Sequence, residues 1–395
     1  MSLAERTKTL PNFPNATSQP TPPSRSAETI AHNNDLLTEI LLRLPIKSLF
    51  KFQSVSKHWL SVISDPNFTV RRNSIPVPVS VSGLFFPRFL RSINDISEFD
   101  FVSLDVDDPT FSSCKSPFRS IPFDDVPFAN EIVQSCSGLL LCFIYSSRAL
   151  RPVNRYIVYN PTTKQYTELP PISPIEDDTE EDIYGISLAF DPSHSAHYKV
   201  VCVRNSKEDR YQIRFTRRRL AVGGSPVVLS PLNAAISIST VEYIVTVVFI
   251  GLTFGKLLRT SMYYGESRVH LHLVDHIFDL QTPRFDVLEM EMDYSGWFVK
   301  FRVDLSDIAS AFPVIVRREF DDGMKRHKYN FSVLCVVRSE VDEESYLVLQ
   351  IPGKVIRYNF KNRTFFKLCD YVTDSSLPEI VGPVAHQYFE SLALV

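Results

Sequence analysis

Residues 36–68 read LLTEILLRLPIKSLFKFQSVSKHWLSVISDPNF, and this stretch decides how the N-terminal part of the chain folds. Its first apolar residues recur at the spacing of one helical face. They are Leu36, Leu37, Ile40, Leu41 and Leu44. Asn34 or Asp35 can begin this helix by accepting amide hydrogens of its first turn. Pro45 ends the helix, because proline disfavours the helical conformation in the residue before it.

The rest of the stretch predicts two more short helices. Ser48 is placed to cap a second helix that carries Leu49, Phe50 and Phe52. A third helix ends before Pro66, and its apolar face holds Val55, Trp59, Val62 and Ile63. A module of about forty residues is near the limit of independent stability, because it buries little surface. The pattern therefore indicates either a docking module that needs a partner or a helical hairpin of a larger core.

The leading leucines, the Leu-Pro break and the VSKHW segment together resemble the F-box family across the whole module. In that family the first helix and the residues around the break bind a Skp-type adaptor, which in turn binds a cullin scaffold. The resemblance therefore implies a subunit of a ubiquitin ligase complex. Its adaptor-binding or supporting positions correspond to Leu36, Leu37, Ile40, Leu44, Pro45, Ile46, Leu49, Phe52, Val55 and Trp59.

These positions do not all suit direct contact with a partner. Leu37, Ile40, Leu44 and Pro45 are expected to touch the adaptor, since exposed apolar groups of this kind fill a partner's groove. Val55 and Trp59 can equally form the module's own small core, and Trp59 is assigned more readily to that core. Loss of adaptor binding when Leu37 and Leu44 become charged would separate ligase coupling from the alternatives.

Composition divides the remaining chain into a leader and a large body. Residues 1–33 are rich in Pro, Ser, Thr and Asn without a signal-peptide core, which favours a disordered leader before an F-box at 34–75. Residues 76–395 contain short runs rich in Val, Ile, Tyr and Phe, such as SGLLLCFIY and SYLVLQIP, so we expect a large all-β domain after the small all-α module. One helix is expected in DLSDIASAFP, before Pro313.

Charge and cysteine content narrow the class of partner. A formal charge of -3 gives no signal for nucleic acid. The apolar run from Tyr243 to Gly255 is shorter than a bilayer-spanning helix, so no membrane segment is expected. The six cysteines show no CxxC pair, which suits reduced thiols in the cytoplasm, the nucleus or both.

Three segments of the body share one spacing pattern, in VYNPTTKQYTEL, IFDLQTPRFDVL and RYNFKNRTFFKL. Each has an aromatic residue (Tyr159, Phe278, Tyr358), then Asn160, Asp279 or Asn359, a second aromatic (Tyr166, Phe285, Phe365) and a leucine (Leu169, Leu288, Leu368). Asn and Asp side chains bond to their own backbone and begin turns, so each copy predicts a strand, a turn and a returning strand. Aromatic hairpins also occur in other β proteins; three copies in register favour the blades of a propeller.

With the F-box, the segments SCSGLLLCF, YNPTTKQYTELPP and SYLVLQIPGKVIRYNF resemble the F-box-associated domain of plant F-box proteins, a kelch-like β-propeller. The resemblance implies that the body binds a target protein for ubiquitination while the F-box binds the adaptor. An interaction propeller without ligase coupling, a product impaired in target binding and a propeller enzyme with an added helical module remain alternatives. Neither the target nor the propeller rim that binds it can be assigned.

No catalytic, metal or cofactor site is expected. His194 with His197 and His270 with His272 have ligand-like spacing, but the sequence places no Cys or carboxylate set beside either pair. There is no nucleophile elbow and no glycine loop for phosphate. The acidic stretch Glu176 to Asp182 is expected to be a solvated loop, with target recognition as the alternative.

Residues 214–260 match neither the repeat nor the family. Codons for VEYIVTVVFIG also encode GVYCNGGIHW when the frame moves by one base, and the second string is similar to the family's usual sequence. IRFTRRRLAVGG can conceal a further copy of the repeat in the same way. We therefore hypothesise a frameshift or a mispredicted exon, with the frame restored before Met262 and no binding role for the tract. The basic run Arg217 to Arg219 is for that reason not interpreted as a nuclear signal.

Sequencing the transcript tests this hypothesis. We expect a different reading frame, or an altered exon boundary, between the codons for Arg214 and Thr260. An intact cDNA that encodes this tract as written contradicts the hypothesis.

Overall fold

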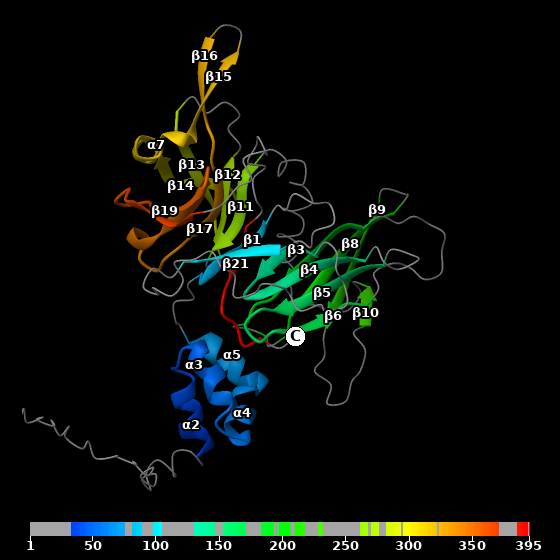
Figure 1. The fold of residues 1–395 in the computed structure, drawn as a ribbon. Coiled ribbons are helices and arrows are strands. Elements are labelled where there is room, and N and C mark those ends of the chain that lie inside the picture. Colours follow the sequence, from blue (N-terminus) through cyan, green and yellow to red (C-terminus); the bar gives the residue numbers. More distant parts are fainter. Residues whose placement is uncertain are drawn as a thin grey trace, which may run out of the picture. The chain divides into compact units, whose positions relative to one another are not determined.

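The structure is a computed structural model. It describes residues 33–75, 81–88, 98–104, 130–146, 153–170, 183–192, 195, 197–206, 210–217, 228–231, 261–267, 270–275, 282–293, 295–321, 324–370, 385–393 and 395. The chain divides into two compact units, residues 1–63 and 64–395. Figure 1 shows helices in the first unit and mostly strands in the second.

The first unit holds three described helices, α2 (Asn34–Leu41), α3 (Ile46–Gln53) and α4 (Lys57–Ile63). The cap of α2 is Asn33, whose side chain accepts from the amides of Asp35 and Leu36 at 3.0 and 3.1 Å. The prediction of Asn34 or Asp35 as the cap was wrong by one or two residues, since an asparagine earlier in the run takes this position. Pro45 does separate α2 from α3 as predicted.

Ser48 does not cap the second helix. Helix α3 begins at Ile46, directly after Pro45, whose extended backbone provides the N-cap without a side-chain bond. Ser48 lies in the first turn, where its amide donates to the Pro45 carbonyl at 2.9 Å. A capping serine does occur before α4, where Ser56 Oγ accepts from the Trp59 amide at 3.1 Å.

A fourth helix, α5 (Pro66–Ser74), follows and belongs to the second unit, so the prediction of three helices was incomplete. Asp65 caps α5 by accepting from the Asn67 amide at 2.7 Å. Pro66 occupies the first turn, where its missing amide hydrogen costs nothing. Proline was interpreted as the end of the preceding helix, although Asp-Pro is also a helix-start signal.

The second unit is mostly β, in several antiparallel sheets. The strand order is β2-β1-β21 in one sheet, and four sheets have the orders β3-β4-β5-β6, β10-β9-β8-β7, β11-β12-β13-β14 and β17-β18-β19-β20. Strands β15 and β16 form a separate pair. Among the described residues no sheet closes on itself. The predicted all-β body is therefore confirmed as a β-rich region, and its arrangement as a propeller is not established by the sheets alone.

The strands have the following bounds. They are β1 (Gly83–Arg88), β2 (Glu98–Ser103), β3 (Asn130–Cys136), β4 (Leu139–Ser146), β5 (Val153–Asn160), β6 (Gln165–Glu168), β7 (Ile183–Ala189), β8 (Lys199–Ser206), β9 (Arg210–Arg217), β10 (Val228–Pro231), β11 (Ser261–Ser267), β12 (His270–Asp275), β13 (Arg284–Met290), β14 (Trp297–Asp304), β15 (Val316–Asp321), β16 (Met324–Tyr329), β17 (Ser332–Val337), β18 (Tyr346–Ile351), β19 (Lys354–Asn359), β20 (Phe365–Asp370) and β21 (His386–Tyr388). Of the tract 214–260, only 214–217 and 228–231 are described, at the paired ends of β9 and β10. The reading-frame hypothesis otherwise lies outside the described residues.

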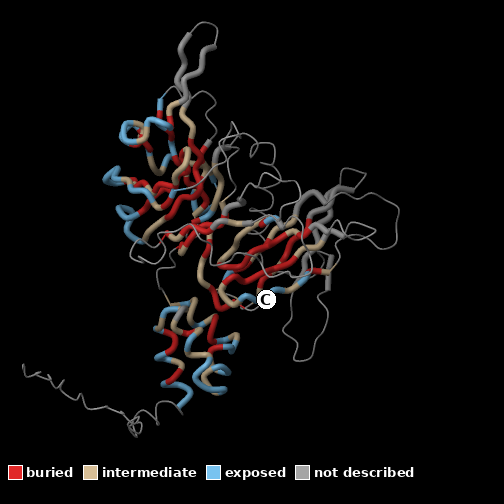
Figure 2. The backbone as a smooth tube through the Cα atoms, in the orientation of Figure 1, coloured by how far each residue is buried: buried red, intermediate tan, exposed pale blue. Residues whose placement is uncertain are grey.

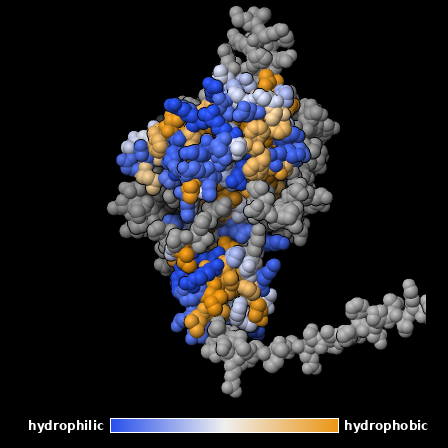
Figure 3. Space-filling model, turned by 90° about the vertical axis from the view of Figure 1, so that its left-hand side faces the viewer, coloured by the Kyte–Doolittle hydropathy of each residue, from blue (hydrophilic) through white to orange (hydrophobic). Residues whose placement is uncertain are grey.

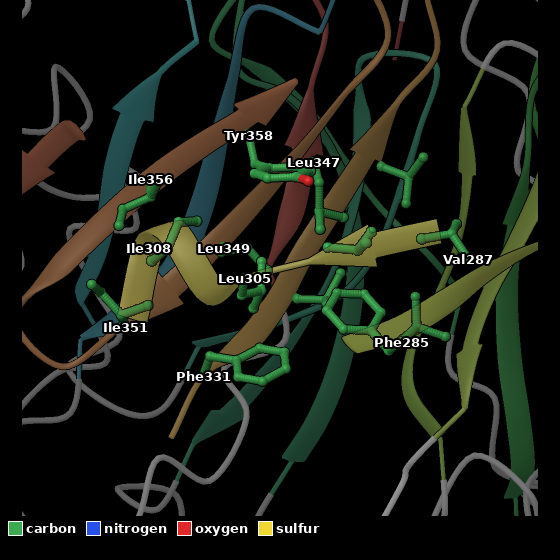
Figure 4. Close-up of a cluster of buried hydrophobic side chains, with 14 of the residues drawn as sticks. Phe285, Val287, Leu305, Ile308, Phe331, Leu347, Leu349, Ile351, Ile356 and Tyr358 are labelled. Carbon is green, nitrogen blue, oxygen red and sulfur yellow. The ribbon is translucent and has the colours of Figure 1, made fainter. Parts of the chain in front are cut away.

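The helix predicted before Pro313 is confirmed as α7 (Ser306–Ala311), which connects β14 to the 3₁₀ helix η2 (Pro313–Ile315). A second 3₁₀ helix, η3 (Asp342–Glu344), lies between β17 and β18. Leu305 and Ile308 are fully buried in the cluster that also contains Phe285 of β13 and Tyr358 of β19. Figure 4 shows Ile308, in α7, directed into this cluster. Leu305, the residue directly before α7, is directed into the same cluster. The segment with α7 therefore packs against both the β11–β14 and the β17–β20 sheet in one shared core. Figure 2 colours the buried residues red.

Two copies of the predicted repeat form the expected hairpins. Tyr159 pairs with Tyr166 across β5 and β6, and Tyr358 pairs with Phe365 across β19 and β20. The turn begins with an asparagine in both cases: Asn160 Oδ1 accepts from the Thr162 amide at 2.9 Å, and Asn359 Oδ1 accepts from Lys361 at the same distance. In the remaining copy, Phe278 and Asp279 lie outside the described residues.

The repeat asparagine has a second role that its spacing does not reveal. Asn160 is fully buried, and its Nδ2 donates to the carbonyls of Ser391 at 3.1 Å and Ala393 at 2.8 Å. Asn359 Nδ2 donates to the Glu343 carbonyl at 2.9 Å, in a more exposed place. The same side chain thus begins its own turn and holds a neighbouring segment.

Residues 386–393 connect several sheets of the second unit. Strand β21 pairs with β1, so the first and last described strands of this unit share one sheet. Beyond it, Ser391 lies over the β3–β4 turn, where Gly138 has φ +86° and an added Cβ would come within 2.5 Å of Ser391 Cβ. Ala393 packs among Leu139 of β4 and Leu188 of β7.

Exchange of the asparagine amide tests this second role. We expect Asn160→Asp to destabilise the protein by about 3 kcal/mol or more, because a buried carboxylate then faces two carbonyls without a donor. Asn359→Asp is the matched control, with a loss of about 1 kcal/mol, since the same turn bonds remain and the site is more exposed. Denaturant midpoints measure both. Equal losses in the two variants would contradict the assigned role.

Candidate functional site

Helix α2 carries two apolar stripes rather than one. Leu37 and Leu41 are buried at 1% and 0% exposure, whereas Leu36 and Ile40 are 48% and 47% exposed. Each pair is spaced four residues apart, so each lies along its own side of the helix. One stripe packs inside the unit, and the other is open to a partner.

The inner side of the helical unit forms a small core. Leu49 and Ile63 are buried at 0% and 1% exposure. Phe52 and Trp59 are half-buried and pack edge to face, with ring centroids 5.4 Å apart. Edge-to-face aromatic pairs stabilise such contacts beyond the area they bury. Trp59 therefore contributes to packing within the unit, which agrees with its predicted role in the module's own core.

Further apolar residues are exposed in α4 and in the connections between the helices. Val55 and Leu60 are 58% and 45% exposed, and Pro45 is exposed between α2 and α3. Leu44 and Ile46 are half-buried beside it. Ten large hydrophobic residues are exposed in the described part of the chain, and four of them lie in this short unit. Figure 3 shows apolar residues gathered on its surface.

Burial changes the roles expected within the ten predicted positions. Leu37 was expected to touch a partner directly, but it is buried, as is Leu49, so both support the outer residues from within. The sequence left the roles of Leu36 and Val55 open between contact and support, and both are exposed. Leu60 is exposed but was not among the ten predicted positions, because the apolar face of the third helix was assigned to Trp59 and Ile63. Its spacing of five residues from Val55 gives only a weak sequence signal.

A buried charged cluster lies between two sheets of the second unit. Glu289 of β13 contacts His272 Nε2 of β12 at 3.1 Å and His270 Nδ1 at 3.3 Å. Arg338, directly after β17, contacts Glu289 at 3.1 Å and Asp342 at 3.2 Å. Lys300 of β14 also contacts Asp342, at 3.2 Å. The cluster therefore links the β11–β14 sheet to the β17–β20 sheet.

One carboxylate, rather than a set of ligands, contacts His270 and His272. Strand register places Glu289 directly opposite His272, although 17 residues separate them along the chain. The described residues nevertheless contain no group of His, Cys, Asp and Glu arranged to hold a metal ion. His194 and the acidic stretch Glu176 to Asp182 lie outside the described residues.

Burial determines the protonation of this cluster. Burial lowers the pKa of His272 and of His270 below the usual value, in spite of the neighbouring Glu289. Burial would raise the pKa of Glu289, but the His272 hydrogen bond and the Arg338 charge together lower it. Glu289 is thus ionised against Arg338 while the histidines stay neutral at pH 7. This arrangement joins the two sheets through a buried ion pair and a carboxylate–histidine contact.

Comparison with known proteins adds two family matches. Residues 33–71 match the F-box domain, and residues 88–219 match the F-box associated beta propeller domain. The chain is 34% identical over 390 residues to F-box protein At5g07610 of Arabidopsis thaliana, covering 88% of each protein. F-box protein At4g19940 of the same plant is 32% identical over 186 residues, which cover 45% of this chain and 41% of that protein. Among the described residues, no helix is long and apolar enough to cross a bilayer.

Stability should depend on pH through the buried histidines. Burial also lowers the pKa of His386 on β21 to about 4. These folded-state values lie below the unfolded value near 6.5, so the stabilisation is complete above that pH and is lost as the pH falls through it. We expect the free energy of unfolding to fall by about 2 kcal/mol from His386 alone between pH 7 and 5. His386→Gln should flatten this dependence, as measured by denaturant unfolding at each pH; an unchanged slope would contradict it.

Proposed function

Because the chain belongs to the family of plant F-box proteins, we propose that it is the target-recognition subunit of a Skp–cullin–F-box ubiquitin ligase. The F-box binds a Skp-type adaptor, which binds a cullin scaffold, and the β region binds the protein to be ubiquitinated. The observation that carries this proposal is the exposed stripe of Leu36 and Ile40 on α2. A helix that is apolar on two sides has more to bury than its own unit can cover.

The docking face follows from exposure. Leu36, Ile40, Pro45, Val55 and Leu60 are accessible and contact the adaptor. The half-buried residues Leu44 and Ile46 complete the rim of this face. Leu37, Leu49, Phe52 and Trp59 hold the helices in place behind it. This division keeps all ten positions in the proposed site and separates contact from support.

F-box proteins generally act without catalysis, and neither family match is to a catalytic family. The subunit accelerates ubiquitin transfer by holding a target lysine near the charged conjugating enzyme. Its contribution is a high effective concentration of the target. No cofactor takes part in this mechanism. The partners are the adaptor, the scaffold and one target protein, and the complex works in the cytoplasm, the nucleus or both.

The β region, residues 76–395 after an F-box at 34–75, is proposed to be a kelch-like propeller. The four-stranded antiparallel sheets have the strand order of propeller blades. The strands proposed as innermost are neighbours: β3 lies beside β7 and β21, and β11 lies beside β17. Pairing of β21 with β1 joins the two ends of the region.

A product impaired in target binding is the second candidate. The match to the F-box associated domain ends at residue 219, inside the tract 214–260 that departs from the family pattern. A reading-frame change there would damage one or two blades and leave the F-box intact.

Charges placed on the exposed stripe of α2 test adaptor binding. We expect Leu36→Glu with Ile40→Glu to abolish co-purification with a Skp-type adaptor, because the groove would have to desolvate two carboxylates. The helical unit should stay folded, since Leu37 and Leu41 remain. Leu37→Glu, in contrast, should unfold the unit and is not a clean test of binding.

The matched control is Glu39→Gln with Arg43→Gln, which alters an exposed i,i+4 ion pair of the same helix region. We expect this control to bind the adaptor within about twofold of the wild type, as surface ion pairs contribute little. Retained binding of the Leu36 and Ile40 double variant, with intact helical circular dichroism, would contradict the proposed function.

A further inference from the structure

One arginine of the β17–β20 sheet is held by aromatic rings. The guanidinium of Arg357, on β19, lies over the ring of Tyr346, on β18, with its Cζ 3.6 Å from the ring centroid. The ring centroid of Phe366, on β20, is 5.4 Å from the same atom. A cation over an aromatic face is attracted by the ring, and a planar guanidinium stacks on it. We name Tyr346, Arg357 and Phe366 the arginine clamp.

Strand register brings these three side chains together. Arg357 is directly opposite Phe366, and Tyr346 is its diagonal neighbour on β18. Long side chains at such positions reach one another across a sheet. Figure 4 shows Ile356 and Tyr358 in the core shared with α7. Since successive side chains of a strand alternate, Arg357 lies on the opposite face of the sheet.

The two rings of the clamp differ in exposure. Tyr346 is 6% exposed and belongs to a buried cluster with Val348 and Val355. Phe366 is 39% exposed, and Arg357 is partly exposed beside it. The clamp therefore presents a cation and an apolar surface to solvent, above a ring that is anchored in the core.

No ion pair or hydrogen bond reaches the Arg357 guanidinium from the residues that the structure describes. The carboxylate of Asp370, at the end of β20, is instead held by Lys354 at 3.0 Å and by Lys367 at 2.6 Å. A separation of 3.6 Å between Cζ and the Tyr346 centroid requires the guanidinium to lie flat on the ring. Its N–H donors then remain at its edge, directed away from the ring.

We propose that the arginine clamp binds a carboxylate of the target protein, an Asp or Glu side chain next to an apolar residue; this step rests on the proposed function. The planar fork of arginine matches a carboxylate through two parallel N–H···O bonds. Because Tyr346 already orients the fork, little side-chain freedom is lost when the carboxylate binds. Phe366 gives the neighbouring apolar residue of the target a surface to contact.

A carboxylate fits the clamp better than a phosphate group does. A phosphate group on a side chain carries about two negative charges at pH 7. The lysines of β19 and β20, Lys354 and Lys367, both contact Asp370. Arg357 therefore offers one positive charge, which a single carboxylate balances and a phosphate group exceeds.

A charge-preserving exchange tests the clamp. Arg357→Lys keeps the cation and removes the planar fork. Arg363→Lys is the matched control, because it makes the same exchange at an exposed arginine of the β19–β20 turn. The probe is the capped peptide Gly-Leu-Glu-Leu-Gly, titrated into the full chain and followed by saturation-transfer NMR. We expect a Kd of about 1 to 10 mM for the wild type, weakened about fivefold or more by Arg357→Lys and changed less than about twofold by Arg363→Lys.

A second comparison uses the wild type alone, so it does not depend on the folding of any variant. The same peptide with glutamine in place of glutamate should bind about fivefold more weakly or worse, because it offers no charged acceptor. Equal binding of these two peptides, equal weakening by the two lysine variants, or no binding of the glutamate peptide at about 10 mM would each overturn the proposal. A phosphoserine peptide that binds about tenfold tighter than the glutamate peptide would also overturn it, in favour of a phosphate ligand.

Adaptor co-purification and denaturant midpoints are measured on the same samples. Retained adaptor binding and an unchanged midpoint confine a failure to the arginine clamp. Loss of adaptor binding in the wild type counts against the proposed function instead.

Discussion

The short helix α2 imposes the constraint on which the proposed function depends. Its eight residues include four large apolar side chains on two sides, and the helical unit can bury only the side of Leu37 and Leu41. The described part of this unit has only two other helices, and their inward residues are used against the first stripe. Leu36 and Ile40 therefore remain in water until a partner covers them. This uncovered stripe is the basis of the adaptor binding that we propose.

The β region is held together differently, by polar groups buried where its sheets meet. Arg338 contacts Glu289 of another sheet, and Asn160 binds the carbonyls of Ser391 and Ala393. Such contacts contribute little net stability over apolar packing, but loss of one partner leaves the other buried without compensation. They consequently fix which strands face each other more than they add stability.

Local sequence signals predicted the elements whose cause is local. The Asx turns at Asn160 and Asn359, the helix before Pro313 and the break at Pro45 each follow from a few adjacent residues. The sequence did not predict the contacts that depend on residues far away along the chain. The partner of His272 is set by strand register, and the second bond of Asn160 is set by the last residues of the chain. The division of α2 into buried Leu37 and exposed Leu36 depends on how three helices pack, which periodicity alone does not specify.

The F-box precedes the tract 214–260 in sequence, and this separation bears on what a reading-frame change would do. The exposed stripe of Leu36 and Ile40 lies before the tract, and the repeat pattern at Tyr358 and Phe365 indicates that the frame is restored after it. The stripe would then keep its intended residues. A reading-frame change would instead destabilise the β region, because its sheets pack against one another through shared cores. Such a product would still occupy the adaptor through Leu36 and Ile40 and would hold its target poorly, so it would compete with intact relatives for the adaptor.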